Sequence, residues 1–167
     1  MQAFPTAVEH ERVLNSLALR QALTHQRFDM IHIAAYVCPR SGDLYFSDVN
    51  PRTGERLGSG ADYISADDVR ALCIKAQTRL VVIASCDSLA LATMLVRDMN
   101  VIAAPDLVGA NMMMVSANMM SAWIGTFYET LPTESLSIAF DLAIKASGAP
   151  MRLLSQKDMI VRVQKAS

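Results

Sequence analysis

The sequence predicts an α/β fold with a mostly parallel central sheet flanked by helices. Runs of strand length that are apolar except at their ends, such as RLVVIAS (79–85) and NVIAAP (100–105), are typical of parallel strands buried on both faces. Segments with apolar residues at helical spacing separate these runs. The 167 residues contain no internal repeat and no Pro/Gly/Ser linker, so we expect one domain covering residues 1–167.

The first part of the chain predicts a helix, a strand and a hairpin. Apolar residues recur at helical spacing over Val8–Leu23, and FDMIHIAAYV (28–37) is a mostly apolar run of strand length. GDLYFSDV (42–49) favours a short hairpin. The three glycines and the Asn-Pro pair of NPRTGERLGSG (50–60) then favour a turn-rich loop.

A second helix is predicted to begin after Ser65, whose side chain can cap it, with Asp68 three residues later. The run 79–85 is the next strand, and Leu89–Met99 has the pattern of a core helix. The buried face of the helix after Ser65 combines four residues: Val69, Leu72, Cys73 and Ala76.

The last part begins with the strand 100–105, which Pro105 ends, and continues into an uncharged segment, Leu107–Tyr128. A helix with a narrow apolar stripe follows, and Gly148 and Pro150 end it. DMIVRVQ (158–164) alternates well enough to predict an edge strand. The stripe consists of Leu136, Ala139, Phe140, Ala143 and Ile144.

Composition excludes several classes of function. The net charge of −1 leaves no basic excess for a phosphate backbone, so we expect no nucleic acid partner. The three cysteines lack a CxxC spacing, so we expect no disulfide framework, no metal and no cofactor, and a cytoplasmic location. The segment Leu107–Tyr128 is long enough to cross a bilayer, but its polar residues, glycines and methionines argue against a membrane span.

In a sheet of this kind the loops at the carboxyl ends of the strands form any site, and Tyr36 and Cys86 both lie at such ends. Several segments, in order, resemble the CHAT domain family, bacterial relatives of caspases and separases. FDMIHIAAY is similar to the family strand that carries two histidines, and RLVVIASCDS is similar to the strand that ends at the catalytic cysteine. ISADDVRAL and IGTFYETLPTESLSIAFDLAIKA are similar to helices of the family. The resemblance covers about Val8–Ala146.

The resemblance implies a caspase-like three-layer sandwich and cysteine protease chemistry in active members. It assigns the nucleophile position to Cys86 and the catalytic histidine position to Tyr36. His32 matches an earlier histidine of the family, inside the strand. The chain is therefore identified as a degenerate member that lacks the catalytic histidine.

Chemistry at Cys86 depends on a base. Tyrosine, with a pKa near 10, is about 0.1% phenolate at pH 7, and loss of a general base costs roughly 100- to 10,000-fold in rate. His32 lies about 13 Å upstream along an extended strand, so we expect it to be a packed strand histidine. Three readings of Cys86 stay open: an idle thiol, which we favour, a nucleophile with an unrecognised base, and a redox or ligand role.

Other features have structural interpretations. We expect Cys73 to be a core residue and Cys38 to be incidental, although Cys38 could be exposed. Asp67 and Asp68 fit the start of a helix, where negative charge is favourable. GERLGSG (54–60) has the glycines of a phosphate cradle but lacks its flanking strand and helix. His10 and His25 have no second ligand at a metal spacing.

The methionines of segment 112–120 surround that segment on several sides, so it is either fully covered or a surface for self-association. The function that follows is a catalytically impaired pseudo-protease, which acts as a protein-interaction module in a bacterial assembly and binds a protein or peptide. The alternative is an active cysteine endopeptidase that uses Cys86 with an unrecognised base.

Overall fold

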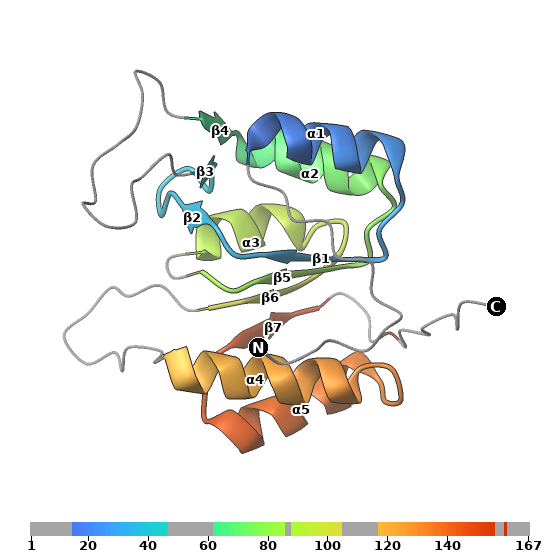
Figure 1. The fold of residues 1–167 in the computed structure, drawn as a ribbon, viewed down its shortest axis with the longest axis vertical. Helices are drawn as coiled ribbons and strands as arrows, with labels where there is room; N and C mark the ends of the chain where they lie inside the picture. Colours follow the sequence, from blue (N-terminus) through green and yellow to red (C-terminus); the bar gives the residue numbers. More distant parts are fainter. Residues whose placement is uncertain (1–14, 47–61, 86–87, 105–116, 156–158, 160–167) are drawn as a thin grey trace.

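The central sheet has four strands and is mostly parallel. The computed structural model describes residues 15–46, 62–85, 88–104, 117–155 and 159. The strand order is β1-β5-β6-β7, in which β1, β5 and β6 are parallel and β7 is antiparallel to β6 (Figure 1). The bounds are β1 Met30–Ile33, β5 Leu80–Ile83, β6 Asn100–Ala103 and β7 Arg152–Leu154. The mixed α/β class and the parallel sheet predicted from the sequence are confirmed.

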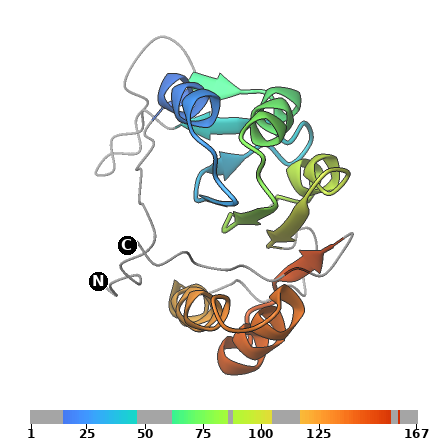
Figure 2. The same ribbon diagram turned by 90° about the vertical axis from the view of Figure 1, so that its right-hand side faces the viewer.

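Five helices cover the two faces of this sheet in the described part of the chain. On one face lie α1 (Ser16–His25), α2 (Ala66–Lys75) and α3 (Leu89–Leu95), and on the other lie α4 (Ala117–Thr130) and α5 (Leu136–Ser147). Figures 1 and 2 show the resulting three layers.

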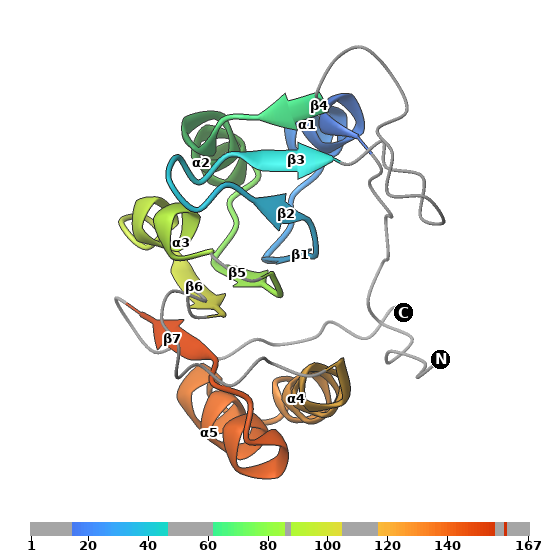
Figure 3. The same ribbon diagram turned by 90° about the vertical axis from the view of Figure 1, so that its left-hand side faces the viewer.

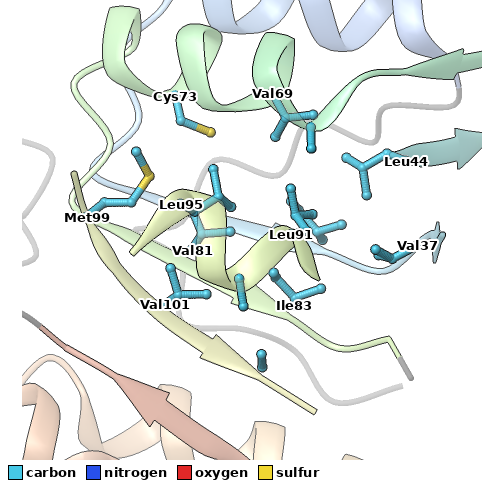
Figure 4. Close-up of a cluster of buried hydrophobic side chains, with 14 of the residues drawn as sticks. Val37, Leu44, Val69, Cys73, Val81, Ile83, Leu91, Leu95, Met99 and Val101 are labelled. Atoms are coloured by element: carbon cyan, nitrogen blue, oxygen red, sulfur yellow. The ribbon is translucent and has the colours of Figure 1, made fainter. Parts of the chain in front are cut away.

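Each central strand contributes side chains to both cores, because successive residues of a strand point to opposite faces. In β5, Val81 and Ile83 belong to the cluster under α1, α2 and α3 (Figure 4), whereas Leu80 and Val82 belong to the cluster with α4 and α5. All four are 0% exposed. Burial of an aliphatic side chain contributes about 1.5–3 kcal/mol, so a continuously apolar strand is needed here.

The helix ends follow the sequence signals. The Ser65 side chain accepts a hydrogen bond from the Asp68 N–H at the start of α2, as predicted. Cys73 is fully buried in the first core, also as predicted. Gly148 ends α5 in the left-handed conformation, with φ of 65°. Such a residue commonly terminates a helix, since glycine has no Cβ to clash.

A second, antiparallel sheet lies beside the first, with the order β2-β3-β4 (Figure 3). Its strands are β2 Tyr36–Val37, β3 Leu44–Phe46 and β4 Asp62–Ile64. The prediction of one strand over 28–37 is wrong in this respect, because the chain leaves the parallel sheet after Ile33 and begins a new sheet at Tyr36. Of the hairpin predicted over 42–49, the described residues contribute one strand, β3, which pairs with β2 before it and with β4 after it, and residues 47–49 lie outside the described part.

Two further differences concern the ends of elements. The helix predicted over Leu89–Met99 ends at Leu95. The sheet edge is formed by β7, which the sequence did not indicate, and the strand predicted over 158–164 lies outside the described residues except for Met159. The loop 50–60 and residues 107–116 also lie outside them. No helix in the described ranges has the length and apolarity to cross a membrane.

The β2–β3 hairpin is held against α3 by a close approach at Gly42. Gly42 has φ of 77°, and a Cβ at this position would lie 2.8 Å from the backbone nitrogen of Leu91. Asp43, the next residue, accepts a hydrogen bond from the Ala66 N–H at the start of α2, at 3.0 Å. The hairpin therefore joins the first turns of two helices.

Replacement of Gly42 with alanine should destabilise the fold by about 2–4 kcal/mol, because left-handed strain of 1–2 kcal/mol adds to a clash with backbone. Gly148→Ala is the matched control. It has a similar φ, but its Cβ would meet only the Met119 side-chain end at 3.9 Å, so the cost should be about 1 kcal/mol. Urea unfolding measures both, and equal losses would contradict the close contact.

Candidate functional site

The candidate site lies where β1 and β5 end. These strands pair in parallel from Met30 with Leu80 to Ile33 with Ile83, always 50 positions apart in the sequence. The Ala84 N–H donates to the Ile33 carbonyl oxygen at 2.9 Å, which extends the pairing past the strand end. Tyr36 and Cys86 are also 50 positions apart. In the sequence, Tyr36 and Cys86 therefore each come three positions after the last paired residue of their strand, Ile33 and Ile83.

Cys86 itself lies outside the described residues, as does Asp87. Its described flanks are Ser85 and Ser88. The Ser88 hydroxyl is buried and donates to the carbonyl oxygen of Ala104 at 3.1 Å, so the start of α3 is tied to the residue that follows β6. The role of Cys86 as the nucleophile position stays a prediction.

Tyr36 lies in the second sheet, not at the end of the buried strand. Its side chain is 60% exposed. It faces Tyr45 across the β2–β3 pair at a ring distance of 5.9 Å, and Tyr45 stacks on Tyr63 of β4 at 5.5 Å. The three rings form a cross-strand row on the outer face of the sheet, while Val37 and Leu44 point into the core. We call it the tyrosine row.

His32 is directed away from this row and toward α4. Its Nδ1 shares a hydrogen bond of 2.7 Å with the hydroxyl of Tyr128, a buried residue of α4. His32 as a whole is exposed, which differs from the packed histidine predicted. Protein atoms nevertheless displace water from the ring, and this desolvation lowers the pKa of His32 below its usual value of 6.5. The bond to Tyr128 orients the imidazole along the sheet face covered by α4.

The lowered pKa of His32 predicts a pH dependence of stability. Above pH 6.5 the imidazole is neutral in both the folded and the unfolded chain, and its contribution to folding is complete. As the pH falls below 6.5, the unfolded chain binds the proton before the folded chain does, so stability is lost between pH 6.5 and the lower folded pKa of His32. Wild type should therefore lose more unfolding free energy between pH 7.5 and 5 than His32→Gln, which keeps a polar partner for Tyr128. Parallel urea curves test this, and equal losses would contradict it.

Cys38 has a more reactive environment than the sequence indicated. It lies at the end of β2, partly exposed, where its N–H donates to the Asp43 carbonyl oxygen at 2.9 Å. A hydrogen bond with the Ser41 side chain, and then backbone N–H groups of Ser41 and Arg40, lower the pKa of the Cys38 thiol. Burial instead raises the pKa of Cys73 to about 12. Hydrogen bonds to a thiolate stabilise it, whereas removal from water destabilises it.

At neutral pH, an alkylating reagent such as iodoacetamide should label Cys38 readily and leave Cys73 unlabelled in the folded protein. Ser41→Ala should slow labelling of Cys38, because it removes the largest contribution to the lowered pKa. Mass spectrometry of the peptides gives the rate at each cysteine. Ser137→Ala is a suitable control, and an unchanged Cys38 rate in Ser41→Ala would exclude this role of the hydroxyl.

The remaining predicted features have structural roles or are not described. Asp67 and Asp68 lie in the first turn of α2, as expected, and the Arg20 guanidinium, 2.8 Å from Asp68, lowers the pKa of that carboxyl. His25 is the last residue of α1. GERLGSG (54–60) and His10 lie outside the described residues. In the described ranges, no cluster of three His, Cys, Asp or Glu residues could hold a metal ion.

The methionine segment 112–120 is described only in part. Met119 and Met120 of α4 are partly buried and pack against the core under α4 and α5. Residues 112–116 lie outside the described part. Self-association through this segment stays a prediction.

Compared with models of known protein families, the chain matches none, and the search of curated proteins also finds no match. The resemblance to the CHAT family consequently depends on the segments quoted above.

The tyrosine row and the Cys38 loop were not recognised in the sequence. A signal for the row existed, since each of three short strands carries one tyrosine, at 36, 45 and 63. Their alignment required the registers of β2–β3 and β3–β4. The Cys38 environment depends on the turn that brings Ser41 back to the sulfur, and a sequence pattern does not specify this contact.

Proposed function

We propose that the chain is a caspase-like domain of the CHAT type, catalytically impaired, which binds a protein or peptide as an interaction module of a bacterial assembly in the cytoplasm. One observation carries the proposal. The parallel pairing of β1 with β5 has the same 50-residue offset as the pair Tyr36 and Cys86, which the resemblance assigns to the catalytic positions.

The impairment follows from proton transfer. Acyl transfer to a cysteine needs a group that accepts the thiol proton and later donates a proton to the leaving amine. Tyr36 occupies the histidine position and is a phenol. The imidazoles in the described ranges are His25, at the end of α1, and His32, whose Nδ1 is bonded to Tyr128. Neither is directed to the ends of β1 and β5.

The tyrosine row supports a binding role. Tyr36 and Tyr63, at the two ends of the row, are 60% and 53% exposed, an unusual state for large aromatic side chains that share one face of a sheet. Aromatic residues are enriched in protein interfaces, because they bury much area with few rotatable bonds. The row flanks the strand ends, so a bound peptide would contact both.

The alternative is an active cysteine endopeptidase that uses Cys86 with an unrecognised base. The two functions differ in the reactivity of Cys86. A peptide electrophile with a chloromethyl ketone group should label Cys86 no faster than it labels a free peptide thiol if the domain is impaired. Rates should be measured with Cys38→Ser as background, because the Cys38 thiol has a lowered pKa and would otherwise dominate the signal.

Cys38→Ser/Cys86→Ser is the matched control for this assay. It should remove any labelling that Cys38→Ser still shows at position 86. Labelling of Cys86 at least about 100-fold above the free thiol, the contribution expected of a general base, would establish the peptidase instead. Tyr36→His should raise the rate if the two positions face each other. An unchanged rate would refute that geometry and, with it, the assignment of Tyr36.

A further inference from the structure

A polar hollow lies at the other end of the parallel sheet. It has a volume of about 320 Å³ and is lined by Arg27, Asp29, Ala76, Gln77 and Arg79. Asp29 directly precedes β1 and Arg79 directly precedes β5. Because these strands are parallel, the hollow lies at their amino ends, whereas the tyrosine row comes after the carboxyl end of β1.

The main chain fixes the two arginine positions. The N–H groups of Arg79 and Leu80 both donate to the carbonyl oxygen of Asp29, at 2.9 and 3.1 Å. Arg27 lies two residues before Asp29, and the Phe28 N–H between them donates to the carbonyl oxygen of Ala76 at 3.1 Å. The backbone of the hollow is thus held by its own hydrogen bonds, and the arginine side chains are not needed for it.

The charges of this hollow are not paired with each other. In the described ranges the ion pairs are Arg20 with Asp68 and Arg70 with Asp98, and neither involves the hollow. Two exposed arginines and one exposed aspartate therefore line one hollow without an ion pair between them. The lining has a formal charge of +1, and an anion would relieve the repulsion between the two cations.

Arginines near helix C-termini often neutralise the free carbonyl groups there. Here most carbonyl groups at the end of α2 already have main-chain partners. The carbonyl oxygens of Leu72, Cys73, Ile74 and the capping residue Ala76 accept from the N–H groups of Ala76, Thr78, Gln77 and Phe28, respectively. The side chains of Arg27 and Arg79 are therefore available for another partner.

Gln77 supplies a further donor at a conformational cost. It has φ of 59°, the one left-handed residue other than glycine in the described ranges. Glycine is the usual residue at such a position after a helix, since a side chain there costs stability. Strained positions of this kind often serve ligand binding. At this one the side chain lines the hollow.

We propose that this hollow binds a small molecule through a phosphate group. The planar guanidinium groups of Arg27 and Arg79 would each donate to phosphate oxygens, and the Gln77 amide would add a neutral donor. Asp29 would accept from a hydroxyl or amine on the rest of the molecule. The volume is at the lower end of the range for ligand pockets, and it exceeds the size of a bare phosphate.

The test uses the full chain and inorganic phosphate as the probe, at constant ionic strength, with chloride as the reference anion. Amide chemical shifts around residues 27–29 and 76–79 should change with phosphate and not with chloride. Arg27→Gln and Arg79→Gln should each weaken binding roughly tenfold, as expected for loss of a charge-assisted hydrogen bond. Arg152→Gln, an exposed arginine of β7, is the matched control and should leave binding unchanged.

Gln77→Gly separates binding from folding. It should raise the thermal unfolding temperature, because it removes the left-handed strain, and at the same time weaken phosphate binding. Acetate in place of phosphate tests which class of anion binds. Equal affinity for the two anions would show that the hollow does not prefer phosphate and would refute the proposal. Equal amide chemical-shift changes with chloride, or an unchanged phosphate affinity in both arginine variants, would also refute it. Arg27 and Arg79 would then be surface arginines without a specific ligand.

Discussion

The parallel pairing of β1 with β5 is the constraint on which the arrangement of both sheet ends depends. Four successive residue pairs, each 50 positions apart in the sequence, place residues of β1 directly beside residues of β5. Beyond the carboxyl ends, the chain continues to Tyr36 in the second sheet and to Ser85, and at the amino ends the Arg79 N–H donates to the Asp29 carbonyl oxygen. A shift of the pairing by one residue would also turn the side chains of β5 to the wrong cores, because the period of a strand is two. Burial on both faces therefore fixes the register, and the register fixes what each end can present.

The hairpin around Gly42 fixes the second sheet against α2 and α3, the helices that cover one face of the parallel sheet. Its backbone approaches Leu91 closely enough to exclude any side chain, and the Asp43 carboxylate accepts from the first turn of α2. The second sheet has only two or three residues per strand, and isolated hairpins of this size are marginal in water. The inward row, Val37, Leu44 and Ile64, is at most 1% exposed and supplies the missing stability. The opposite row of tyrosines can then remain exposed without loss of the fold.

Elements governed by local periodicity and burial could be predicted from the sequence, whereas those governed by tertiary contacts could not. β5 is fully apolar and β6 is apolar after Asn100, because these strands lie between two cores. Helix α2 has both its cap at Ser65 and its stripe. The break after Ile33 had no such signal, since AAYV continues the apolar run. β7 is short, and RLL lacks the alternation that identifies an edge strand. At the candidate site, the position of Tyr36 beside the strand end could be anticipated from the strand pattern, but its entry into another sheet, and the bond between His32 and Tyr128, depend on where α4 and β3 pack.

The chemistry that the Cys38 thiol can perform is limited by which neighbouring groups can donate a proton. Hydrogen bonds from Ser41 and neighbouring N–H groups lower the pKa of Cys38, so its thiolate fraction rises without any imidazole. The donors are neutral and keep their protons at pH 7, so none of them can return a proton to a leaving amine. Such a thiolate can react with electrophiles that need no acid, whereas cleavage of a peptide bond also needs a proton donor for the leaving amine. Reactivity of a cysteine and peptidase activity are therefore separable properties of this fold, and the second requires an imidazole directed at the sulfur, whereas the described imidazole nearest in sequence is bonded to α4.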